Sequence, residues 1–183
     1  MCSPKKKESK YKDFTLNLAG EYIYSGDYLE YSEENPLPYA KMRILLPALS
    51  LASASAVLAS GLFAAPGTVD RFYVILPMSA TIACALLAAY CAFRFAMVGN
   101  PMRRFDYDAF MKPFSVRLKA CALFAAITLI AYLIHLIVSG IGDYGLWSAL
   151  LFPVLVAACG VASFIASVLL ERQVWITQEI MKK

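Results

Sequence analysis

The sequence predicts an all-α integral membrane protein, with four transmembrane helices arranged as two antiparallel hairpins. Hydrophobic residues make up 60% of the 183 residues and charged residues only 16%, which is too apolar for an ordinary soluble domain. Apart from Arg71, every Lys and Arg lies before, midway between or after the two pairs of apolar stretches. The stretches themselves, which contain no Asp, Glu, Lys or Arg, are Ile44 to Ala64, Phe72 to Phe93, Ala120 to Ser139 and Tyr144 to Leu170.

Each apolar stretch is long enough to cross a membrane, because a hydrocarbon layer of about 30 Å needs about 20 helical residues. Backbone N–H and C=O groups in lipid need internal partners, which favours helices. We expect spans at about residues 42–64, 72–98, 116–139 and 144–170. The first two and the last two are joined by only a few residues, so each pair forms an antiparallel hairpin.

The positive charges predict the orientation. They fall in the N-terminal segment (1–41) and its junction with the first span, in the central loop with its flanks, and in the C-terminal tail (171–183). By the positive-inside rule these parts face the cytoplasm. We therefore expect a multi-pass protein of the cytoplasmic or plasma membrane with both termini inside. The net charge of +4 is explained by topology and the lipid bilayer, and no nucleic-acid partner is expected.

The N-terminal segment is the most distinctive hydrophilic part of the chain. Six of the eleven tyrosines lie between Tyr11 and Tyr39. Apolar and polar residues alternate around Phe14, Leu16 and Leu18 and again at Tyr22 and Tyr24, before a turn sequence at Ser25-Gly26-Asp27. This pattern predicts a short β-hairpin. A lone hairpin is only marginally stable in water, so it needs the helix ends or a partner protein to rest on.

The central loop mixes aromatic and basic residues between Met102 and Phe114, which predicts a short interfacial helix that stops near Pro113. Arg94, at the end of the second span, and Arg103 and Arg104 in the loop are candidates for binding lipid headgroups.

Small residues recur every fourth position in the first and last spans, at Ala48, Ala52, Ala56 and Ser60 and at Ala158, Ala162 and Ala166. Such ridges let helices approach closely. We expect them to pack spans 1 and 4 together, with recruitment of another membrane subunit as the alternative.

The only histidine, His135, lies about one turn from the outer end of span 3, with Tyr132 and Ser139 on roughly the same face. Ionisable groups at membrane depth are often functional. A structural hydrogen bond and a role in a pore, a ligand site or a proton relay are both open for these three residues. We expect no metal and no cofactor, because a single histidine without neighbouring ligands completes neither a zinc nor a haem site.

No nucleophile, paired-carboxylate or nucleotide-binding motif is present, so an enzyme is the least favoured class and no catalytic residue is assigned. The leading hypothesis is an accessory or assembly subunit that binds a membrane or cytoplasmic partner protein. The alternative is a transport or small-ligand-binding unit, as a homo-oligomer, with a cavity near His135.

Overall fold

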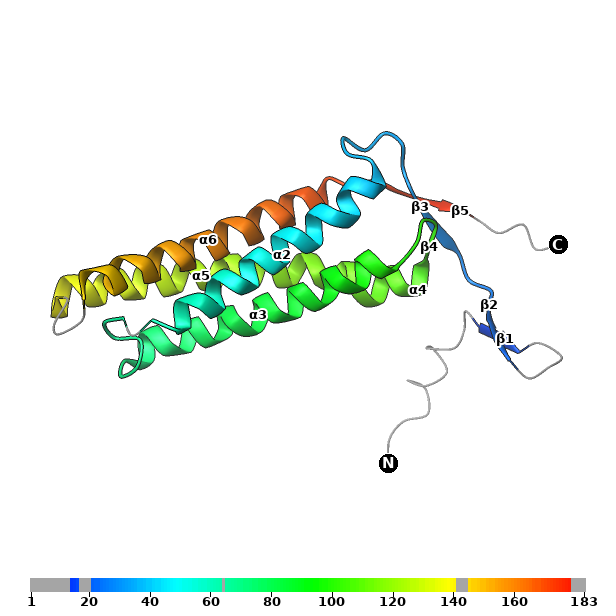
Figure 1. Cartoon of the computed structure of the whole chain (residues 1–183). Coiled ribbons are helices and arrows are strands. Elements are labelled where there is room, and N and C mark those ends of the chain that lie inside the picture. The colour runs from blue at the N-terminus through cyan, green and yellow to red at the C-terminus, as the bar shows by residue number, and fades with distance from the viewer. Residues whose placement is uncertain (1–13, 17–20, 64, 141–144, 179–183) are drawn as a thin grey trace, which may run out of the picture.

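The computed structural model describes residues 14–16, 21–63, 65–140 and 145–178. Four long helices lie side by side, and short strands gather near one end of the bundle (Figure 1). The elements in order are β1 (Phe14–Leu16), β2 (Tyr22–Tyr24), β3 (Tyr28–Tyr31), α2 (Tyr39–Gly61), α3 (Phe72–Met97), β4 (Met102–Arg103), α4 (Arg104–Asp106), the π-helical turn η1 (Tyr107–Met111), α5 (Lys112–Ser139), α6 (Leu146–Glu171) and β5 (Trp175–Gln178).

Four helices within the described residues are long and apolar enough to cross a membrane, in agreement with the four predicted spans. The shortest, α2, has 23 residues, or about 35 Å at 1.5 Å per residue. Large apolar side chains point outward along the bundle, and Ile137 and Trp147 are each 85% exposed. Water would penalise so much exposed apolar surface, whereas lipid does not.

Each long helix packs against two others: α2 contacts α3 and α6, and α5 contacts α3 and α6. The core runs along the whole bundle. Phe95 and Phe114 are buried toward the strands, Val57 lies in the middle, and Tyr132 and Phe152 are buried toward the opposite end.

The third long helix begins earlier than predicted. Helical residues run without interruption from Arg104 to Ser139, so the expected stop near Pro113 is wrong. Proline has no N–H to donate, and in a regular α-helix its ring would clash with the carbonyl of Ala109. The π-helical turn η1 ends at Met111, two residues before this proline, and its wider hydrogen-bond spacing accommodates the break.

Two strands of the N-terminal segment pair antiparallel, as predicted for a short hairpin, but the predicted turn sequence does not join a pair of strands. β1 and β2 are antiparallel, with Phe14 opposite Tyr24. The sequence Ser25-Gly26-Asp27 does not fold β3 back on β2; β3 instead lies between β4 and β5 in a second sheet. The partner strands come from the central loop and the C-terminal tail, so the pattern of the N-terminal segment alone gave no sign of them.

Candidate functional site

Three segments that are distant in sequence meet at one end of the bundle. β3 pairs antiparallel with β4, with Leu29 opposite Met102, and with β5, with Tyr31 opposite Trp175. We call the two sheets and α4 the cap (Figure 1). The N-terminal segment, the central loop and the C-terminal tail therefore share one end of the bundle, and a single sheet holds them there.

An aromatic cluster fixes the cap to the helix ends. The Trp175 ring lies 5.3 Å from that of Tyr31, 5.7 Å from Tyr107 and 6.3 Å from Tyr39, and Tyr39 in turn lies 5.7 Å from Phe95 of α3. Rings at such separations attract each other beyond their burial. The Tyr31 hydroxyl donates to the Leu37 carbonyl at 2.8 Å. Burial raises the pKa of Tyr31 above its usual 10, so the hydroxyl keeps the proton that it donates.

Two asparagine side chains close the ends of the sheet. Asn100 accepts from the Tyr31 N–H at 3.0 Å, where β4 is too short to do so. Asn35 donates to the Val174 carbonyl at 2.9 Å and accepts from the Val174 N–H at 2.7 Å. Asn35 thus holds the chain as it enters β5.

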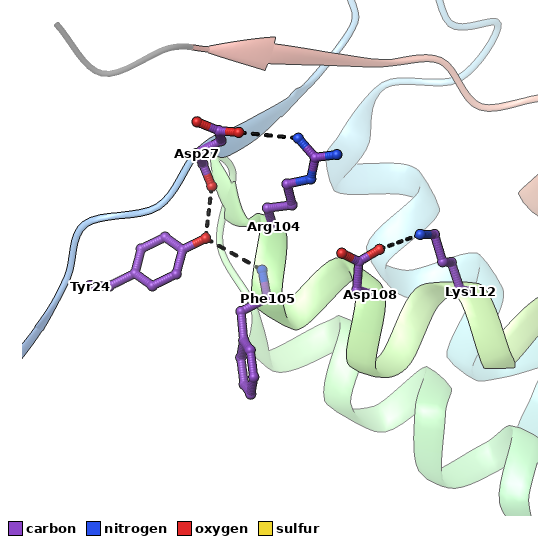
Figure 2. A network of polar contacts seen from close by, with 6 residues as sticks. All are labelled: Tyr24, Asp27, Arg104, Phe105, Asp108 and Lys112. Atoms are coloured by element: carbon purple, nitrogen blue, oxygen red, sulfur yellow. Dashed lines mark hydrogen bonds and ion pairs between the residues drawn. The ribbon is translucent and has the colours of Figure 1, made fainter. Parts of the chain in front are cut away.

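The β1–β2 pair is attached to the start of α4 by a polar network (Figure 2). The Tyr24 hydroxyl donates to the Asp27 carbonyl at 2.9 Å and accepts from the Phe105 N–H at 3.4 Å. Arg104 forms an ion pair of 3.1 Å with Asp27, and its backbone N–H donates to the Asp27 carbonyl at 3.0 Å. One turn further on, Lys112 pairs with Asp108 at 2.5 Å.

The three arginines predicted to bind headgroups all lie near the cap and are exposed. The Arg94 guanidinium stacks on Phe110, 4.6 Å from the ring centre, and that of Arg103 lies 5.6 Å from the centre of Tyr24. Arg104 is bound to Asp27. Their role at a membrane surface stays a prediction.

At the opposite end of the bundle, His135 is 5% exposed and has a partner that sequence analysis missed. Its Nδ1 lies 2.7 Å from the Tyr73 hydroxyl, and Ser139 Oγ is more distant at 3.5 Å. Gly67 lies over the same ring: a Cβ there would stand 2.6 Å from His135 Cδ2. Tyr73 is the second residue of α3 and so lies at the same end of the bundle as His135. This shared position is the feature of the sequence that could have indicated the contact.

Tyr132 does not join this group. Its hydroxyl donates to the Ala149 carbonyl at 2.9 Å, and its ring packs 4.6 Å from that of Phe152. Nor does His135 line the two pockets at the cap or the pocket between α5 and α6 among the described residues. A ligand, pore or relay role for His135, Tyr132 and Ser139 remains a prediction.

A second buried polar group, also missed, lies in the middle of the bundle. Ser53 Oγ of α2 is 2.7 Å from Ser163 Oγ and 3.2 Å from Cys159 Sγ, both on α6, and Ser163 donates to Cys121 Sγ of α5 at 3.3 Å. All four side chains are at most 1% exposed. These hydrogen bonds join three helices, and interhelical bonds of this kind help hold bundles together in lipid.

Spans 1 and 4, which are α2 and α6, contact each other as expected, but the predicted small-residue ridges are only partly buried: Ser60 and Ala166 are buried. Ala48 and Ala52 of α2 and Ala158 of α6 are exposed, whereas the neighbouring Ser53 and Ser163 face the interior. Ser53 and Ser163 lie on the buried face, where their hydroxyls bond each other between helices, because a hydroxyl in hydrocarbon needs a partner.

Two pockets lie at the cap. One of about 400 Å³ is bordered by Tyr31, Tyr39 and Asn100, and another of about 260 Å³ lies between the start of α5 and the end of α6. Within the described part of the chain, no three metal-ligating side chains come together.

No family model, no curated protein and no solved structure matches this chain in the three comparisons.

Proposed function

We propose that this protein is a membrane-embedded accessory or assembly subunit, which holds a partner protein through its cap. The observation that supports this most directly is the open edge of β5. Among the described residues, no strand pairs with the side of β5 that faces away from β3. An unpaired strand edge presents a row of N–H and C=O groups, to which an extended segment of another protein can add.

The proposal includes an orientation in the membrane. Each helical hairpin crosses the bilayer and returns, and the cap faces the cytoplasm of a cell whose plasma or cytoplasmic membrane holds the chain. Support comes from charge: α2 begins with Lys41 and Arg43 near the cap, and α3 ends there with Arg94. At the other end, among described residues, Arg71 is the only basic side chain, and it pairs with Asp70 at 3.4 Å. The positive-inside rule then places the cap inside.

The pairing pattern tells which N–H groups the edge offers. The Ser32 N–H donates to the Val174 carbonyl at 3.2 Å, so the residues at this position form a hydrogen-bonded pair. Hydrogen-bonded and non-hydrogen-bonded pairs alternate along antiparallel strands. Glu30 and Ile176 therefore form the next hydrogen-bonded pair, and Leu29 and Thr177 form a non-hydrogen-bonded pair. The Thr177 N–H therefore points away from β3, toward the open edge.

The side chains of this edge suit a partner as well as the backbone does. Val174 is 51% exposed and Ile176 is 53% exposed, on a part of the chain that extends beyond the end of α6. Apolar side chains along an exposed edge strand invite pairing. A partner strand would cover them and complete the sheet.

Co-purification tests the proposal. The full chain is extracted in mild detergent and the proteins that accompany it are identified and quantified. We expect one defined partner chain in a fixed ratio with the wild type and with Thr177→Val, which keeps the N–H. Thr177→Pro removes the outward N–H and leaves the bonds to β3 in place, and proline is tolerated at sheet edges. We expect this variant to lose the partner.

A control separates loss of the edge from loss of the cap. Ile176→Pro removes a donor to β3 and should loosen the sheet itself, which faster amide exchange at residues 28–31 would show. Thr177→Pro should leave that exchange unchanged. Equal recovery of a partner with Thr177→Pro and Thr177→Val would contradict binding through this edge.

The competing proposal, a transport or ligand-binding unit near His135, draws on the contact between the buried His135 and the half-exposed Tyr73. It makes the opposite prediction in the same experiment: a homogeneous oligomer of this chain with no second protein. His135→Asn would then abolish ligand binding, whereas for an assembly subunit it should leave partner recovery unchanged.

A further inference from the structure

The pocket between the start of α5 and the end of α6 has the chemistry of a headgroup site. It has a volume of about 260 Å³ and lies beneath β5, where two membrane helices reach the cap. It combines two aromatic rings, one acidic and one basic side chain, a hydroxyl and an amide. These residues are Tyr107, Trp175, Glu171, Lys112, Ser115 and Gln173.

One atom of a residue that lines this pocket lacks a partner. Gln173 Oε1 is buried, and no donor within the described structure reaches it, although the Nε2 of the same amide donates to the Leu169 carbonyl at 3.3 Å. A buried carbonyl oxygen without a hydrogen bond is costly. A ligand whose N–H or O–H reaches this oxygen would remove that cost.

The neighbouring groups specify a cation. Glu171 receives a hydrogen bond from Ser115 at 2.9 Å and an ion pair from Lys119, both at Oε1. Among described residues, Oε2 is left to meet a second positive group. The rings of Tyr107 and Trp175, 5.7 Å apart, add aromatic faces that attract cations. An ammonium group satisfies the carboxylate, the rings and the Gln173 oxygen together.

The other side of the pocket suits an anion. The Lys112 ammonium, held by Asp108 at 2.5 Å, borders it, whereas the Ser115 hydroxyl already donates to Glu171. Lysine binds phosphate as a point charge. A phosphate and an ammonium a few bonds apart make a phosphoethanolamine group. Choline carries the same charge but has no N–H to donate, so it would leave the Gln173 oxygen unpaired.

We propose that this pocket binds a phosphoethanolamine group, with the ammonium on Glu171 and Gln173 and the phosphate on Lys112. A membrane phospholipid with this headgroup and soluble phosphoethanolamine share the chemistry. The site lies at the level where the apolar helices end, which is the depth of headgroups in a bilayer. It is independent of partner binding through β5.

Thermal unfolding of the purified full chain in detergent tests the site. Phosphatidylethanolamine, phosphatidylcholine and phosphatidylglycerol with identical acyl chains are added in separate series, and soluble phosphoethanolamine in a fourth. We expect half-maximal stabilisation by phosphatidylethanolamine at a lipid concentration about fivefold below that for phosphatidylcholine, the factor that one hydrogen bond contributes. Stabilisation by the soluble compound would identify a free ligand as a second source, and stabilisation by lipid alone would identify the bilayer.

Two variants assign the preference to the pocket. Gln173→Leu removes the acceptor, and Glu171→Gln removes the negative charge. In either variant we expect phosphatidylethanolamine and phosphatidylcholine to stabilise the protein at the same concentration. Gln178→Leu changes a glutamine of the same tail outside the pocket and should keep the preference. Equal responses of the wild type to all three lipids, or an unchanged preference in both pocket variants, would overturn the proposal.

Discussion

Gly67→Ala should destabilise the protein because this position combines a backbone and a packing requirement. Gly67 has a φ of 72°, a left-handed conformation that costs another residue about 1–2 kcal/mol. The new Cβ would also stand 2.6 Å from His135 Cδ2 and 2.9 Å from Nε2. Such distances are too short for carbon, so the imidazole must move.

Movement of the ring would break the 2.7 Å contact between Tyr73 and His135. A hydrogen bond of this kind contributes about 0.5–1.5 kcal/mol, and double-mutant cycles in a membrane protein average about 0.6 kcal/mol. Together with the backbone cost, we expect Gly67→Ala to lower the free energy of unfolding by about 2–3 kcal/mol. Tyr73→Phe alone should lower it by about 0.5–1.5 kcal/mol.

Titration with a denaturing detergent in mixed micelles, followed by circular dichroism, measures these differences. Gly145→Ala is the control, since its φ is −68° and no atom lies within 4 Å of the added Cβ; we expect a cost of at most about 1 kcal/mol, because alanine is a poorer N-cap of α6 than glycine. The double variant should fall short of the sum of its single effects, because Gly67→Ala has already displaced the ring. A Gly67→Ala chain as stable as Gly145→Ala, or full additivity with Tyr73→Phe, would refute the reasoning.

Three further predictions concern the core and the cap. Ser53→Ala should cost about 0.6–1.7 kcal/mol of unfolding free energy, the range for interhelical hydrogen bonds in lipid, whereas Ser79→Ala, whose hydroxyl bonds only its own helix, should be nearly neutral in the same titration. Asn35→Ala should speed amide exchange in β5 about tenfold, because Val174 loses both bonds to that side chain; unchanged exchange would show that β5 is held by β3 alone. Arg104→Gln should cost at most about 1 kcal/mol, since its ion pair with Asp27 is exposed, and the difference should shrink in high salt.

The parts of the site that sequence reasoning found are those that depend on a single element. His135 was identified because it is the one histidine, and it lies in an apolar stretch. Tyr73 escaped notice because its contact with His135 crosses from one helix to another, 62 residues apart. Ser53, Cys121 and Ser163 were missed for the same reason: each looks like an ordinary small residue until three helices bring them together.

The pocket proposed for phosphoethanolamine could not have been read from the chain. Its residues come from η1, the start of α5, the end of α6 and the C-terminal tail. Nothing in their spacing relates Tyr107 to Trp175, which the sheet of the cap brings within 5.7 Å of each other.

The sequence by itself determined the four apolar helices. Their hydrophobicity is continuous over each stretch, and the number of residues that cross a hydrocarbon layer is fixed by the rise of the helix. The sequence also predicted strands in the N-terminal segment, since alternation is a local pattern.

Tertiary structure alone decided which faces are buried and which strands pair. The alanine and serine faces of α2 are similar in size, and only the position of the neighbouring helices buries Ser53 and leaves Ala52 exposed. β3 likewise pairs with strands about 70 and 150 residues away, because the bundle brings the central loop and the C-terminal tail to the same end. Contacts between distant segments leave no periodic trace in a chain, whereas the hydrophobic length of a helix does.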